Sequence, residues 1–143
     1  MAHRMIDEEG LRTSRSGVPR VEFQTVEDGS PTVRVTFTSS RLDNGIPGHH
    51  AVVTFSEVLD FRWTDFDLGI LPGNQHDAEF GLQEIEESEL VRPMMDRDRN
   101  LHPPEKVGGG VDWDSVHHYR IVFDDHGAYD VVCFEMQVEF VPT

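Results

Sequence analysis

Histidine and carboxylate side chains are the groups in this sequence with the widest chemical potential. The 143-residue chain holds 8 His and 27 Asp or Glu residues, and a single Cys. Imidazole and carboxylate groups are common ligands of divalent metals. Successive residues of a strand point to opposite faces, so His117 and His118 cannot chelate one ion as a strand pair. A metal site would have to combine several elements, and its candidate ligands are His49, His118, Asp124 and His126.

A second possible ligand set lies at Asp96, Asp98 and Asn100, which match the first three ligand positions of a calcium-binding loop. The rest of that motif is missing. Leu101 stands where the sharp turn requires glycine, and Val107 stands where the bidentate glutamate belongs. We therefore interpret this run as a solvated, charged segment.

Patterns of nucleophilic catalysis and nucleotide binding are missing from the sequence. No serine has the glycine spacing of a nucleophile elbow, and the glycines at 108–110 lack the residues that complete a phosphate-binding loop. Cys133 shares a predicted strand face with Tyr129 and Val131, which is typical of a buried, unreactive thiol. We expect no cofactor and favour a non-enzymatic role.

The excess of acidic residues is the strongest signal in the composition. Only 12 Lys and Arg residues offset the acids, which leaves a formal net charge of -15 at pH 7. This charge repels phosphates and anionic lipids, so neither nucleic acid nor a membrane surface is an expected partner. It would favour encounter with a basic protein. The candidate partner-binding residues are Asp65, Asp67, Asp124 and Asp125.

Carboxylates also cluster at Glu84, Glu86 and Glu87. A glycosidase or an acid–base pair needs two carboxyls that face each other across a pocket, and sequence spacing does not show that here. Their abundance in the chain lowers the value of any one pair as a signal.

Cysteine content and the N-terminal sequence bear on compartment. One cysteine excludes an intramolecular disulfide and a multi-cysteine zinc site. Residues 1–17 lack the apolar run of a signal peptide or a spanning helix. We therefore expect a cytoplasmic protein. Both a monomer and a homodimer remain open, since antiparallel sheets often pair through exposed edges.

Alternating apolar residues predict a mainly β chain, with a β-rich α+β fold as the alternative. We expect residues 1–19 to form a mobile N-terminal tail and residues 20–143 to form one domain. The predicted architecture is an antiparallel sheet or sandwich of about six to eight short strands with at most one or two short helices. Val21 and Phe23 share one side of a first predicted strand, and Val33, Val35 and Phe37 share one side of the next. Ala51, Val53 and Phe55 can face the core.

A helix is predicted after Ser88, because a serine hydroxyl can accept hydrogen bonds from the free amides of a first helical turn. Val91 and Met94 have helical spacing. Pro93 lacks the amide hydrogen that a helix interior uses, so we expect a brief or kinked helix. Residues 96–115 follow as a predicted long loop, of the kind that is usually disordered or functional.

The C-terminal segment carries the clearest strand pattern. Residues 124–127 have the composition of a tight turn and lie between two alternating runs, which predicts a β-hairpin. We expect a final strand to follow it. Tyr119, Ile121 and Phe123 share the core-facing side of the first strand, and Tyr129, Val131 and Cys133 resume the alternation in the second. Met136, Val138 and Phe140 continue it into the final strand.

The hairpin from His118 to Cys133 resembles the C-terminal hairpin of certain small bacterial proteins of unknown function, some of which resemble immunity proteins of toxin systems. The resemblance covers this hairpin and, more loosely, residues 84–91. It implies β architecture. No functional residue is carried over, because the matching positions are strand and turn residues without a catalytic signature.

Two functional hypotheses follow. The first is an acidic, non-enzymatic protein-interaction module, of the inhibitor or immunity type, that binds a basic partner. The second is a small β-rich ligand-binding protein or enzyme with a divalent-metal site built from His and Asp residues, over which the loop at 96–115 could act as a lid.

Overall fold

A computed structural model describes residues 2–5, 19–25, 30–38, 49–65, 81–102, 111–123 and 126–142. For residues 2–5, 49 and 142 it describes the main chain alone. No helix within these ranges is long and apolar enough to cross a membrane.

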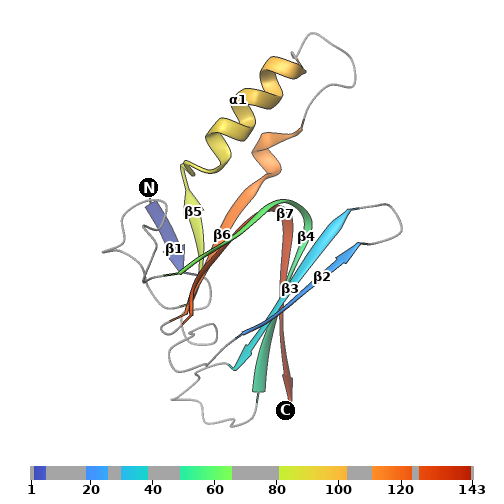
Figure 1. Cartoon of the computed structure of the whole chain (residues 1–143), viewed down its shortest axis with the longest axis vertical. Coiled ribbons are helices and arrows are strands. Elements are labelled where there is room, and N and C mark those ends of the chain that lie inside the picture. The colour runs from blue at the N-terminus through green and yellow to red at the C-terminus, as the bar shows by residue number, and fades with distance from the viewer. Residues whose placement is uncertain are drawn as a thin grey trace.

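The described residues form seven strands, one α-helix and one short 3-10 helix (Figure 1). The strands make a single sheet in the order β1-β5-β6-β7-β4-β3-β2, and each pair of neighbours is antiparallel. The predicted fold class is confirmed. The elements are β1 (Ala2–Met5), β2 (Arg20–Thr25), β3 (Pro31–Thr38), β4 (His49–Thr64), β5 (Gly81–Glu86), α1 (Val91–Leu101), η2 (Trp113–Ser115), β6 (His117–Phe123) and β7 (Gly127–Pro142).

Strand β3 shows why the apolar alternation produces this sheet. Val33, Val35 and Phe37 are buried, while the residues between them are only partly buried. In β4, Ala51 lies opposite Phe37 and is also fully buried. One face of the strand pair therefore points into the core, as the sequence predicts.

In the long strands β4 and β7, of 16 residues each, the alternation of core-facing residues shifts by one residue at the same level of the sheet. Phe55 faces the core on β4, and after Glu57 the inward residue is Val58. Glu57 has a φ of 53°, in the left-handed region. Leu59 is then an extra residue, because Val58 pairs with Cys133 and Asp60 pairs with the adjacent Val132. Such a bulge bends a strand and increases its twist.

The sheet consequently folds over its own concave face, and the core lies between its two halves. In Figure 1, β4 and β7 curve from one half to the other. Rings from strands that are not neighbours meet across this core. Ring centroids lie 5.5 Å apart for Phe37 and Phe123, 5.8 Å for Phe55 and Tyr119, and 5.1 Å for Phe23 and Phe61.

The predicted C-terminal hairpin is confirmed by the pairing of β6 with β7, from His117↔Cys133 to Phe123↔Gly127. Gly127 has a φ of 96°, and a Cβ atom there would lie 2.1 Å from the carbonyl oxygen of Thr64. Only glycine fits such a close approach. The predicted final strand is the second half of β7, continuous with the hairpin strand.

The helix differs from the expectation. It runs over 11 residues, longer than the predicted brief helix, because it begins at Val91 and Pro93 therefore lies in its first turn. Amides of the first turn have no partner inside the helix, so proline is tolerated there. Residues 96–101, within the predicted loop at 96–115, belong to α1, and η2 lies near the end of that loop.

Residues 2–5, within the predicted tail, form β1 along the edge of β5. Edge pairing uses the backbone, so it needs no apolar alternation that a sequence pattern could show. Residues 6–18 of that tail lie outside the described part of the chain.

Candidate functional site

A pocket of about 490 Å³ lies where β5 ends, α1 begins and β6 begins. This volume is in the range of about 300–1,000 Å³ found for small-ligand sites. Helix α1 projects from the sheet next to it and has no buried residue (Figure 1). The lining residues are Glu84, Ile85, Glu86, Glu87, Ser88, Val91, Arg92, Met95, Val116, His117 and His118.

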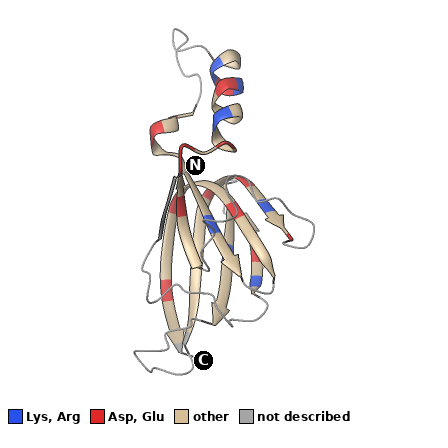
Figure 2. Cartoon of the chain, turned by 90° about the vertical axis from the view of Figure 1, so that its left-hand side faces the viewer, with Lys and Arg blue, Asp and Glu red and all other residues tan. Residues whose placement is uncertain are grey.

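The pocket combines carboxylates with apolar side chains. Glu86 ends β5 and Glu87 begins the link to α1, and both are exposed. Figure 2 shows acidic residues in red where β5 leads into α1. Glu87 has a φ of 53°, a conformation that non-glycine residues adopt rarely. Val91, Met95 and Val116 supply an apolar lining. A pocket of this kind suits a ligand with both a charged and an apolar part.

Among the carboxylates of the pocket, Glu84 contacts a histidine of β6. His117 Nδ1 lies 2.8 Å from Glu84 Oε1, in a partly buried contact. The His117 ring also stacks on Tyr119, with centroids 5.7 Å apart. Glu84 is thereby held against β6.

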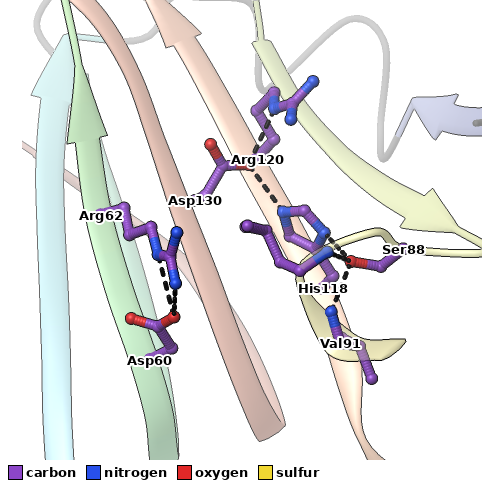
Figure 3. A network of polar contacts seen from close by, with 8 residues as sticks. Asp60, Arg62, Ser88, Val91, His118, Arg120 and Asp130 are labelled. Carbon is purple, nitrogen blue, oxygen red and sulfur yellow. Dashed lines mark hydrogen bonds and ion pairs between the residues drawn. The ribbon is translucent and has the colours of Figure 1, made fainter. Parts of the chain in front are cut away.

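A buried polar chain runs beneath the pocket, from Ser88 through His118 to Asp130 and Arg120 (Figure 3). Ser88 Oγ lies 2.6 Å from His118 Nδ1, and His118 Nε2 lies 2.6 Å from Asp130 Oδ1. Arg120 Nε donates to the same Asp130 oxygen at 2.8 Å. The side chains of His118 and Asp130 are 0% and 1% exposed.

The donors and acceptors of this chain can be assigned. The Ser88 oxygen already accepts two hydrogen bonds, so its own proton is directed at His118 Nδ1, and His118 Nε2–H then donates to Asp130 Oδ1. Ser88 Oγ itself accepts from the amides of Leu90, at 3.1 Å, and Val91, at 3.2 Å. Ser88 thus caps the first turn of α1, as the sequence predicts, and ties that turn to β6.

The contacts run from Ser88 to His118 and on to Asp130, which is the order of serine, histidine and aspartate in a catalytic triad. Their geometry favours a structural role. Both lone pairs of the Ser88 oxygen are engaged by backbone amides, and those amides point at the serine oxygen, where an oxyanion hole would instead aim donors at a substrate oxygen. We therefore assign Ser88 as a helix cap and not as a nucleophile.

Asp130 lies directly opposite Arg120 on β6 and Arg62 on β4. Arg62 pairs instead with Asp60, at 2.9 Å. Asp130 Oδ2 is buried and accepts no hydrogen bond within the described part of the chain. Removing one partner from such a buried ion pair leaves an uncompensated charge. Substitutions at Asp130 or Arg120 should therefore destabilise the fold.

The structure places the metal-ligand candidates in different environments. His118 belongs to the buried chain, about five strand residues, or roughly 16 Å, from the turn that holds His126. His126 Nε2 lies 2.7 Å from the Tyr129 hydroxyl, and the Trp63 indole donates to the His126 carbonyl oxygen at 2.8 Å. The side chain of His49 and the whole of Asp124 lie outside the described residues. Among described residues, no three His, Cys, Asp or Glu side chains could hold a metal ion together.

Of the predicted partner-binding residues, only Asp65 lies within the described ranges, partly buried directly after β4. Asp67, Asp124 and Asp125 lie outside them. The carboxylates that do line a common pocket are Glu84, Glu86 and Glu87, which the sequence marks as a cluster. The sequence signal that distinguishes them from the other carboxylates is the predicted helix cap at Ser88, directly after Glu87.

No family model matches this chain, and no curated protein and no solved structure matches it.

Proposed function

We propose that this protein is an acidic, non-enzymatic interaction module that binds a basic protein partner, in the manner of an inhibitor or immunity protein. The observation that carries the proposal is the pocket between β5, α1 and β6, which three carboxylates line in a chain of net charge -15. The site we propose for the partner is therefore this pocket.

Electrostatics support this choice of partner. Glu86 and Glu87 are exposed beside the pocket, and Arg92 is the cation of its lining. A negative field over the whole surface speeds the approach of a basic protein, and carboxylates at the site fix its orientation. A protein that blocks a nucleic-acid-binding surface must present negative charge in the same way as phosphates do.

Salt-dependent capture tests the proposal. The protein is immobilised, a lysate of its source is passed over it at low and at moderate salt, and retained proteins are identified by mass spectrometry. We expect a retained basic protein whose binding weakens as salt rises, because the contact is electrostatic. Retention of no basic protein at either salt concentration would contradict the proposal.

Matched variants locate the site on the protein. Glu86→Gln with Glu87→Gln should reduce capture, whereas Glu22→Gln with Glu139→Gln removes the same charge from β2 and β7 and should not. Asp124→Asn with Asp125→Asn tests the hairpin turn in the same way. Loss of capture in that last variant alone would move the site from the pocket to the turn.

A further inference from the structure

We infer that the pocket at the base of α1 receives a single lysine or arginine side chain of the partner. This inference rests on the proposed function and specifies the chemical group that the site recognises. Three properties of the pocket support it: an apolar lining, carboxylates beside it, and a rigid floor.

The apolar lining matches the aliphatic part of such a side chain. Val91, Met95 and Val116 come from α1 and from the residue before β6. Lysine and arginine commonly bury their methylene groups against apolar surface while the charged end reaches polar groups or water. A small, fully hydrated cation would gain nothing from these three side chains.

The carboxylates match the charged end. Glu86 and Glu87 are exposed, and Glu84 is held by His117 at 2.8 Å. Hydrogen bonds between a cationic group and carboxylates are shorter and stronger than neutral ones. A metal ion would need several converging ligands, and the described residues offer no such group of His, Cys, Asp or Glu.

The floor of the pocket is already fixed before a ligand arrives. Ser88 is bonded to His118 and to the amides of Leu90 and Val91, so the first turn of α1 is tied to β6. A preformed site does not lose binding energy to ordering of its own side chains. Arg92 also lines the pocket and repels a cationic ligand, so removal of its charge should strengthen binding.

Binding of small model compounds tests the inference on the intact chain. Nα-acetyl-arginine amide and Nα-acetyl-lysine amide carry the cationic side chains, and the citrulline and norleucine derivatives are their uncharged counterparts. Amide shifts in ¹H–¹⁵N spectra report the site. We expect the cationic pair to shift the amides of Glu86, Glu87 and Val91 with affinities on the order of millimolar, and the uncharged pair to leave them unchanged.

Variants with opposite expected signs sharpen the test. Glu86→Gln with Glu87→Gln should weaken binding of the cationic compounds by about tenfold, and Arg92→Gln should strengthen it. Glu22→Gln with Glu139→Gln, an equal loss of charge elsewhere, should change nothing. Equal binding of charged and uncharged compounds would overturn the inference, as would the absence of shifts at the pocket. If lysate capture still depends on Glu86 and Glu87 in that case, the proposed function stands and only the single-side-chain inference fails.

Discussion

At the residue scale, Ser88 connects the helix to the sheet. Its oxygen accepts from the amides of Leu90 and Val91 at the start of α1, and its proton goes to His118. Ser88→Ala removes the cap and leaves His118 Nδ1 buried without a donor. We expect a loss of about 2 kcal/mol in the free energy of unfolding, measured by urea denaturation.

Ser115→Ala is the control for that substitution, because Ser115 donates to Asp112 in an exposed contact. It should change the free energy of unfolding by less than about 0.5 kcal/mol. Ser88→Thr keeps the hydroxyl and should recover part of the loss. Covalent labelling of Ser88 by a fluorophosphonate would contradict our assignment of this residue as a cap.

Cys133 is a second residue whose chemistry follows from burial. Desolvation raises the pKa of its thiol from 9.0 to about 12. The folded state favours the neutral thiol, so this contribution to stability is complete below pH 9 and is lost as the pH rises toward 12. We expect no reaction with Ellman's reagent at pH 8 until the protein is unfolded in urea. Rapid reaction of the native protein would show that Cys133 is accessible.

At the element scale, α1 depends on contacts at its two ends, since none of its residues is buried. Near its C-terminal end, Asp98 Oδ2 accepts from the Val111 amide at 2.9 Å and from the Trp113 indole at 2.8 Å. These two hydrogen bonds, the Val111 amide first, lower the pKa of Asp98 below 3.8. The contact therefore stabilises the fold fully above pH 3.8 and is lost as the pH falls through the folded-state pKa.

Asp98→Asn should loosen this contact at neutral pH, because the amide side chain is a weaker acceptor than a carboxylate. In a Trp63→Phe background, emission from Trp113 should shift to longer wavelength. Asp96→Asn makes the same change at an exposed position of the same helix and should leave the emission unchanged. Identical spectra for the two variants would mean that Asp98 does not hold α1 to η2.

At the scale of the whole molecule, one core stabilises both halves of the bent sheet. Ile121 is fully buried in that core. Ile121→Ala leaves a cavity and should cost about 2–5 kcal/mol, measured by thermal and urea denaturation. Gln137→Ala, at an exposed site on β7, should have little effect.

Because the halves share this core, unfolding of the variant should remain a single transition. In a Trp113→Phe background, circular dichroism, which reports the sheet, and Trp63 emission, which reports the end of β4, should give the same midpoint. Two separate midpoints would show that the halves of the sheet unfold independently.

The sequence by itself determined the local elements. Residues such as Val35 and Ile121 are buried where alternation predicts, and β6 pairs with β7 as the expected hairpin. These features depend on neighbours along the chain, so a local pattern is sufficient. The capping role of Ser88 was accessible for the same reason.

Tertiary structure decided the bend and the candidate site. The pairing of β5 with β6 brings Ser88 to His118, 30 residues later in the chain, and the pairing of β6 with β7 brings Asp130 to the same histidine. The sequence marked His118 as a possible metal ligand because its residue type suits that role. Its partners are set by the register of β6 with β5 and β7, and the bend is set by the change of face at Glu57 on β4. Neither leaves a periodic signal in the sequence, because both depend on contacts between distant segments.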